Sequence, residues 1–212
     1  MNCQTIRVHD TVSQSTIYGP GNRYVIWVQG CSLSCPGCWN IETWDKNGGE
    51  VRLISELIEE YESTGPHEGI TIMGGEPLQQ SSACLTLIEG IRDSNGSIVL
   101  YTGYEPNEFD ETMQKCFMAS DLVISGRYVQ ELRDIGLRWR GSSNQVIHRV
   151  SELYSELEIE EMNEVEITID QDTGQVQVFG YPTLELLEMM EFDLGIEVLQ
   201  NRAPRLRHSE QY

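Results

Sequence analysis

Three cysteines lie close together in the segment Cys31-Ser-Leu-Ser-Cys35-Pro-Gly-Cys38. Three thiolates in one tight loop can bind three irons of a cubane cluster, whereas an electron-transfer cluster is usually held by four cysteines. The iron without a protein ligand then keeps an open coordination position, as a catalytic zinc does. Pro36 and Gly37 suit the close turn that brings Cys35 and Cys38 onto adjacent irons. The spacing therefore predicts a metal site with a vacancy.

Two other interpretations of these cysteines stay open, namely a zinc site completed by a fourth residue and buried thiols without a metal. The remaining cysteines are poor fourth ligands, because Cys84 and Cys116 fall on apolar stripes of predicted helices and Cys3 lies near the terminus. None of the four histidines has metal-ligand spacing to a neighbour: His9, His67, His148 and His208. An iron–sulfur cluster is favoured, but not from the cysteines alone.

The composition narrows the classes of partner. The chain has 212 residues, 39% of them hydrophobic and 23% charged, as in an ordinary globular protein. Its formal net charge of −20 repels phosphate backbones and anionic membranes, so neither nucleic acid nor a membrane is an expected partner. No run reaches the roughly 18 apolar residues of a membrane span. The start, MNCQTIRVHD, lacks the apolar core of a signal peptide, so a cytoplasmic protein is expected.

Strand and helix patterns alternate over the first 150 residues, which predicts an α/β fold with a parallel sheet and covering helices. Apolar and β-branched runs predict strands, and periodic apolar stripes predict helices. The predicted strands are 23–29, 70–73, 97–101 and 121–124, and the predicted helices are 51–63, 81–93 and 109–117. The loops 30–40, 74–77, 102–104 and 125–128 all follow strands, so they are expected to meet at one edge of the sheet.

The pattern changes after residue 150, where glutamates crowd the segment 152–166. This segment is expected to be a solvated connection or an exposed helix. VEITID and QVQVFG then alternate apolar and polar residues around Gln171-Asp172-Thr173-Gly174, a β-hairpin signal. A helix is expected after Pro182-Thr183. Residues 1–150 and 151–212 are therefore treated as a core and a C-terminal extension.

Several stretches, taken in order, resemble the radical S-adenosylmethionine (SAM) superfamily, whose signature is C-x3-C-x2-C. The resemblance is closer to the activating enzymes of glycyl-radical enzymes, especially the family that activates anaerobic ribonucleoside-triphosphate reductases. The matching stretches are Gly19-Pro20-Gly21-Asn22-Arg23, Gln29 to Asn40, Gly74-Gly75-Glu76-Pro77, Tyr101-Thr102-Gly103-Tyr104, Ser125-Gly126-Arg127-Tyr128 and Trp139-Arg140-Gly141-Ser142-Ser143-Asn144-Gln145. Together they span roughly residues 5 to 150.

This resemblance implies a partial (β/α) barrel, followed here by a hairpin and helix extension that the reductase activators lack. It also implies a [4Fe–4S] cluster on Cys31, Cys35 and Cys38, with SAM chelated to the open iron. One electron then cleaves SAM to methionine and a 5′-deoxyadenosyl radical, which abstracts hydrogen from a glycine Cα of a partner enzyme. A low-potential electron donor such as flavodoxin is the other implied partner. The cofactor supplies the difficult chemistry, and the protein orients it.

The resemblance assigns cofactor-binding roles, and a plainer interpretation stands beside most of them. Gly74, Gly75 and Glu76 would face the methionine ammonium, but they also suit an ordinary turn at a strand end. Gly37 and Trp39 would contact adenine, although Trp39 equally suits the core. Three further residues would contact the ribose or the carboxylate of SAM, and each equally suits a solvated loop: Thr102, Ser125 and Arg127.

Three functions stay open from the sequence. The favoured one is an activase that forms a glycyl radical on a reductase-like partner. The second is a radical SAM enzyme acting on a small molecule, similar to 7-carboxy-7-deazaguanine synthase, and the third is a non-enzymatic iron–sulfur module. Residues 151–212 leave the target of the radical undecided, because the resemblance ends near residue 150.

Overall fold

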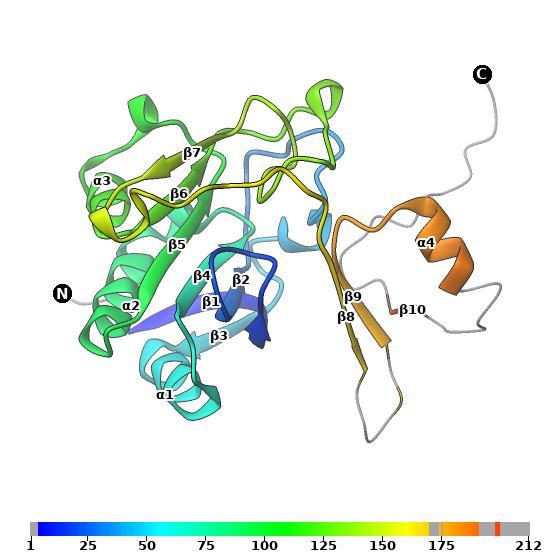
Figure 1. The fold of residues 1–212 in the computed structure, drawn as a ribbon. Helices are drawn as coiled ribbons and strands as arrows, with labels where there is room; N and C mark the ends of the chain where they lie inside the picture. Colours follow the sequence, from blue (N-terminus) through cyan, green and yellow to red (C-terminus); the bar gives the residue numbers. More distant parts are fainter. Residues whose placement is uncertain (1–3, 170–173, 175, 191–197, 200–212) are drawn as a thin grey trace.

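A computed structural model describes residues 4–169, 174, 176–190, 198 and 199 of the chain. Its central sheet contains β1 (Thr5–Ser15), β2 (Arg23–Val28), β3 (Glu50–Leu53), β4 (Gly69–Gly74), β5 (Ser97–Thr102), β6 (Leu122–Ser125) and β7 (Val146–Arg149). The strands are arranged in the order β3-β1-β2-β4-β5-β6-β7 (Figure 1). The α/β class and the four strands expected from the sequence are confirmed.

The four central strands, β2, β4, β5 and β6, are parallel, as expected. The register pairs Val28 with Gly74 and Thr102 with Ser125, so all four strands end at the same edge of the sheet. The expectation of a wholly parallel sheet is wrong, because β1, β3 and β7 are antiparallel to their neighbours. The order leaves β3 and β7 as the two edges of an open, mixed sheet in the described residues.

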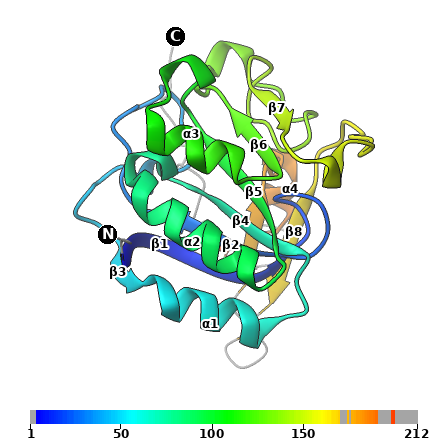
Figure 2. The same cartoon turned by 90° about the vertical axis from the view of Figure 1, so that its left-hand side faces the viewer.

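Three helices cover one face of this sheet: α1 (Ile54–Thr64), α2 (Ser81–Asp93) and α3 (Glu111–Met118) (Figure 2). Their apolar stripes pack on alternate strand residues such as Ile26, Ile72 and Leu100, which form one buried cluster. The helix expected at 51–63 begins later, because residues 51–53 pair with β1 as strand β3. No helix among the described residues is long and apolar enough to span a membrane.

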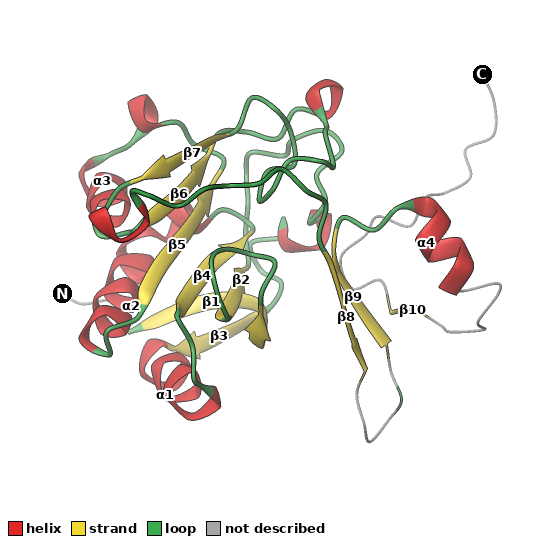
Figure 3. Ribbon diagram, viewed as in Figure 1, coloured by secondary structure: helices red, strands yellow, loops and turns green. Residues whose placement is uncertain are grey.

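The opposite face of the sheet is contacted by the C-terminal extension. Its strands β8 (Val165–Ile169) and β9 (Val176–Gly180) form the expected antiparallel hairpin, and β10 (Val198–Leu199) pairs with β9. The expected helix is α4 (Leu184–Glu188). Figure 3 shows this small sheet on the side away from α1, α2 and α3. Phe179 stacks on Trp27 of β2 at 6.4 Å between ring centroids, so the extension packs directly on the core.

Arg23 anchors the beginning of the parallel strands. Its side chain is fully buried, and its guanidinium donates hydrogen bonds to the Thr71 hydroxyl (2.8 Å), the Ser97 carbonyl (3.0 Å) and the carbonyls of Pro20 and Ile70. The Tyr154 hydroxyl, which comes from the extension, lies 3.5 Å from the guanidinium. Arg23 is the first residue of β2, whereas the cysteine loop follows the last residue of β2. The role of Arg23 is therefore structural.

We predict that Arg23→Met lowers the free energy of unfolding by about 3–5 kcal/mol, because several buried acceptors lose their donor at once. Arg52→Met is the control, since Arg52 makes partly exposed ion pairs with Glu56 and Glu60. Such a surface substitution costs at most about 1 kcal/mol. Urea denaturation of both variants measures the difference, and equal losses would contradict a structural role for Arg23.

Candidate functional site

The cysteine loop follows the last residue of β2 and is fixed by backbone hydrogen bonds. Gly30 N–H donates to the Thr43 carbonyl (2.7 Å), and Cys31 N–H donates to the Trp44 carbonyl (3.2 Å). Cys38 N–H donates to the Cys35 carbonyl (3.1 Å), which closes the turn expected around Pro36 and Gly37. Gly37 adopts a φ of 72°, a left-handed conformation that glycine tolerates best. The three thiols therefore share one tight, well-defined loop.

The chemistry of these thiols fits a metal cluster. All three cysteines are free and half-buried, and burial raises the pKa of each thiol. A positively charged metal centre opposes this effect by stabilising the thiolates. Among the described residues, no three metal-binding side chains converge as ligands of a single ion would. In a cubane cluster each cysteine bonds a different iron, so convergence on one point is not required.

The two cysteines assigned to packing are confirmed as core residues. Cys84 and Cys116 are fully buried in the cluster beneath the helices. The Cys84 thiol donates to the Pro77 carbonyl (3.1 Å), and the Cys116 thiol donates to the Ser81 carbonyl (3.2 Å). Cys3 lies outside the described residues.

Gly74, Gly75 and Glu76 lie directly against the cysteine loop. Gly75 N–H donates to the Val28 carbonyl (2.8 Å), and Glu76 N–H donates to the Gly30 carbonyl (2.9 Å). A Cβ added to Gly75 would lie 2.5 Å from the Gly30 carbonyl oxygen, and one added to Gly74 would lie 2.7 Å from the Trp27 Cα. Only glycine permits this approach of the two loops, so the two glycines do more than make a turn.

The carboxylate of Glu76 is buried and joins the loop after β4 to the loop after β5. It accepts hydrogen bonds from Leu78 N–H (2.9 Å), the Thr102 hydroxyl (2.8 Å) and Gly103 N–H (2.7 Å). Burial raises the pKa of Glu76 to about 7, although these donors and Arg127 oppose the shift. Thr102 is therefore a buried support of Glu76 rather than a solvated loop residue.

Ser125 and Arg127 lie at the same edge but make contacts within the protein. Ser125 is buried, and its hydroxyl lies 2.8 Å from His148 Nε2. The Arg127 guanidinium forms a two-pronged ion pair with Glu108, at 2.6 and 2.7 Å, and holds the pKa of that carboxyl at about 2. Burial raises the pKa of Cys35 and of Glu76, and the charge of Arg127 opposes the shift at both groups, so Arg127 lies near them. SAM contacts of both residues stay predictions.

Trp39 links the cysteine loop to the extension. Its ring lies 5.2 Å from the Tyr181 ring, and the Arg133 guanidinium lies 5.5 Å from its centroid. Tyr181 follows β9 directly, and its electrostatic neighbours include Cys38. No sequence signal pointed to Tyr181, because it lies 143 positions after Cys38 and outside every motif.

The segment from Trp139 to Gln145 is tied to the loop after β6. The Asn144 side chain donates to the Arg127 carbonyl (2.8 Å), and the Gln145 amide donates to the Gly126 carbonyl (3.0 Å). Gln145 also accepts from Gly141 N–H (2.7 Å). Asn144 and Gln145 therefore support the loop after β6. Trp139 is buried with a φ of 61°, which is rare for a bulky residue.

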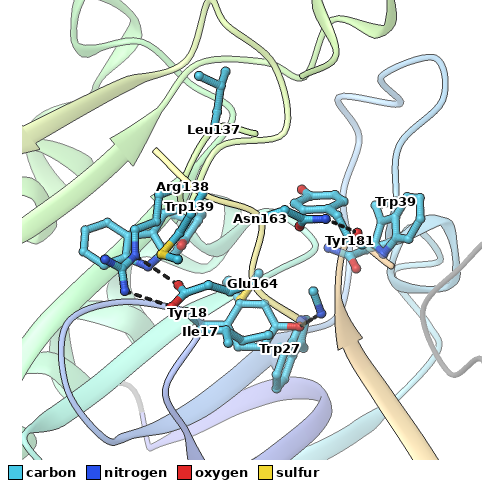
Figure 4. A pocket seen from close by; sticks show the side chains of 15 residues that line it. Ile17, Tyr18, Trp27, Trp39, Leu137, Arg138, Trp139, Asn163, Glu164 and Tyr181 are labelled. Carbon is cyan, nitrogen blue, oxygen red and sulfur yellow. Dashed lines mark hydrogen bonds and ion pairs between the residues drawn. The ribbon is translucent and has the colours of Figure 1, made fainter. Parts of the chain in front are cut away.

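A cavity lies between the helix-free face of the sheet and the extension (Figure 4). Side chains from the central sheet, from Trp139 and from the extension line it together. The acidic connection is not simply solvated, because Glu164 pairs with Arg138 at 3.0 Å and Glu161 pairs with Arg140. These ion pairs fasten the extension beside the cavity.

Several known proteins are similar to this chain in sequence. Residues 17–148 match the model of a family described as a 4Fe-4S single cluster domain. An anaerobic ribonucleoside-triphosphate reductase-activating protein of Vibrio cholerae is 34% identical over 149 residues, which cover 66% of this chain and 96% of that protein. Proteins of the same name are 33% identical in Escherichia coli (67% and 97% covered) and 32% identical in Enterobacteria phage T4 (61% and 85% covered).

The family match ends at residue 148, before the extension begins. It confirms the family expected from the sequence and, with it, an iron–sulfur enzyme that uses a [4Fe–4S] cluster and SAM. The third function left open by the sequence, a non-enzymatic module, is thereby set aside. The chain belongs to the family of the anaerobic ribonucleoside-triphosphate reductase-activating proteins.

Proposed function

We propose that this chain cleaves SAM reductively and uses the resulting 5′-deoxyadenosyl radical to form a glycyl radical on a reductase-like partner. The observation that carries the proposal is the contact between the cysteine loop and the Gly74-Gly75-Glu76 loop, made by the hydrogen bond from Glu76 N–H to Gly30. The names of the relatives support the choice of partner. A low-potential donor such as flavodoxin would supply the electron, and the protein would act in the cytoplasm.

The residues of this chain bind and orient the two cofactors. Cys31, Cys35 and Cys38 would hold the cluster, which supplies one electron and an open iron position for the methionine end of SAM. Glu76 would accept a hydrogen bond from the methionine ammonium. A carboxylate has about four acceptor sites, and the protein uses three of those of Glu76, so one is left for this ligand.

The fold supports the same proposal. The described sheet is open and mixed, and its four parallel strands, with helices on one face and loops at their carboxyl ends, support a partial (β/α) barrel as the proposed architecture of the core. We take residues 1–150 as this core and residues 151–212 as an extension that covers its open face. Trp39 would then contact adenine with its ring, and Gly37 would contact it through the backbone.

The cavity beside the extension raises one other candidate function, a radical SAM enzyme that acts on a small molecule such as a deazapurine precursor. Its volume of about 60 Å³ holds only a few water molecules, so a bound heterocycle would require the walls to move. The activase is therefore the better-supported candidate.

The proposal is tested by anaerobic reconstitution with iron and sulfide, followed by reduction with dithionite in the presence of SAM. Release of 5′-deoxyadenosine is expected, and a glycyl-radical doublet is expected in the EPR spectrum once the reductase is added. Release without any doublet would favour the small-molecule candidate. If protein that carries a full cluster releases no 5′-deoxyadenosine, both the activase and the small-molecule candidate are wrong.

Cys35→Ala is expected to abolish cluster binding, because it removes one of the three ligands. Iron and sulfide content and the visible absorption of the reconstituted protein measure this. Cys84→Ala is the matched control, since Cys84 is buried in the core beneath the helices, and it should cost stability alone. A full cluster in the first variant would overturn the ligand assignment.

Glu76→Gln is expected to remove a pH dependence of stability. Burial raises the pKa of Glu76 to about 7 in the folded protein, so folding favours the protonated carboxyl. The stability that depends on this proton is present at low pH and is lost as the pH rises from about 4.5 through 7. The loss is roughly 3 kcal/mol, at about 1.4 kcal/mol per pKa unit. Urea denaturation at pH 5 and pH 8 should show the variant gaining stability relative to the parent at the higher pH. A difference that does not change with pH would contradict the shifted pKa.

A further inference from the structure

Trp44 lies beside the cysteine loop, where backbone hydrogen bonds hold it. Its carbonyl accepts a hydrogen bond from Cys31 N–H (3.2 Å). The buried side chain of Gln29 donates to the Glu42 carbonyl (3.1 Å) and to the Asp45 carbonyl (2.8 Å), which lie on either side of Trp44 in the chain. These bonds fix the position of Trp44 without using its indole.

The indole N–H of Trp44 is buried and makes no hydrogen bond of regular geometry with the described residues. An indole N–H can only donate, and a buried donor that stays unpaired costs about 1–3 kcal/mol. Such donors are uncommon in native proteins unless an ion, a ligand or a water molecule meets them. The Trp44 indole therefore requires an acceptor.

Cys38 is the neighbour that can become this acceptor. Burial raises the pKa of the Cys38 thiol, and the donors at Asn40 N–H and at the Trp44 side chain oppose the rise. At Cys31 and Cys35 the hydrogen bonds that oppose the rise in pKa come from backbone groups. Cys38 thus differs from the other two cysteines in having a side-chain donor beside it.

Binding of a cluster would make this contact stronger. A neutral thiol is a weak acceptor, whereas hydrogen bonds to an ionised acceptor are shorter and roughly twice as strong. Reduction adds negative charge to the cluster and its sulfur ligands, so a donor to one of these sulfurs stabilises the reduced state more than the oxidised state. Hydrogen bonds to the sulfurs are among the factors that set the reduction potential of an iron–sulfur cluster.

We infer that Trp44 is a positioning residue that donates its indole N–H to the Cys38 thiolate and thereby raises the reduction potential of the cluster. This inference rests on the proposed function for the assignment of Cys38 as a cluster ligand, but not for the cleavage of SAM. Because the cluster is then easier to reduce, Trp44 limits how strong a reductant the electron donor must be.

The test is a redox titration of the reconstituted, full-length protein without SAM, followed by the EPR signal of the reduced cluster. Trp44→Phe keeps an aromatic ring and removes the N–H, so the equilibrium constant for one-electron reduction should fall about tenfold. This fall corresponds to a midpoint potential about 59 mV more negative.

Trp139→Phe is the matched control, because it also removes a buried indole N–H that has no partner among the described residues. Trp139 packs with Val99 of β5 and Ile124 of β6, and its substitution should leave the midpoint potential at the value of the parent. A midpoint potential of Trp44→Phe that equals that of the parent, or is less negative, overturns the inference. The same shift in both variants also overturns it.

If Trp44→Phe does not take up a full cluster, pulsed EPR of the reduced protein decides. Protein labelled with a nitrogen isotope in its tryptophan indoles should show a hyperfine coupling between the label and the cluster, and Trp39→Phe should retain this coupling. A missing coupling, or one that is lost in Trp39→Phe, overturns the inference. A more negative potential in Trp44→Phe, with no release of 5′-deoxyadenosine by the parent once SAM is added, supports the inference and refutes the proposed reaction. The two failures are therefore distinguishable.

Discussion

The close approach of Gly75 to Gly30 is the constraint on which the rest of the site depends. Two backbone hydrogen bonds join the loops after β2 and β4 at a separation where no side chain fits. Because Glu76 continues from this contact into bonds with Thr102 and Gly103, the loop after β5 is fixed as well. Backbone bonds between neighbouring strand ends thus place the thiols, the carboxylate and the loops at one edge before any cofactor binds. Such preorganisation lowers the entropic cost of assembling a reactive site.

The extension changes what a chain of this family presents on the helix-free face. It meets the core through buried contacts, including Phe179 on Trp27 and the Tyr154 hydroxyl, which lies 2.9 Å from the Ser97 hydroxyl. Its glutamates do not merely add charge to an acidic chain, since two of them pair with Arg138 and Arg140. Three residues of these contacts, Trp27, Arg138 and Glu164, also line the cavity.

Much of the fold follows from local sequence patterns, and the errors have physical causes. The strands ending at Val28 and Thr102 are continuous apolar runs, which buried parallel strands require. Strand β1 was not predicted because polar residues occupy both of its faces in the sequence TIRVHDTVSQS. Its register against β2 also shifts twice. The cluster loop and the Gly74 to Glu76 loop could be predicted because each is contiguous. The cavity could not, since Tyr101, Trp139 and Tyr181 come from three separate segments, and periodicity says nothing about which distant side chains meet.

The buried contacts of the extension also decide what kind of element it is. A detachable lid would be joined by few apolar contacts and by exposed bonds that water replaces at little cost. Here, opening would expose Trp27 and Phe179 together and would take Tyr154 away from the network of Arg23. A stacked aromatic pair alone is worth about 0.5–1.5 kcal/mol beyond its buried area. The described part of the extension is therefore a wall of the folded core, and the shape of the cavity is set by the same interactions that stabilise the chain.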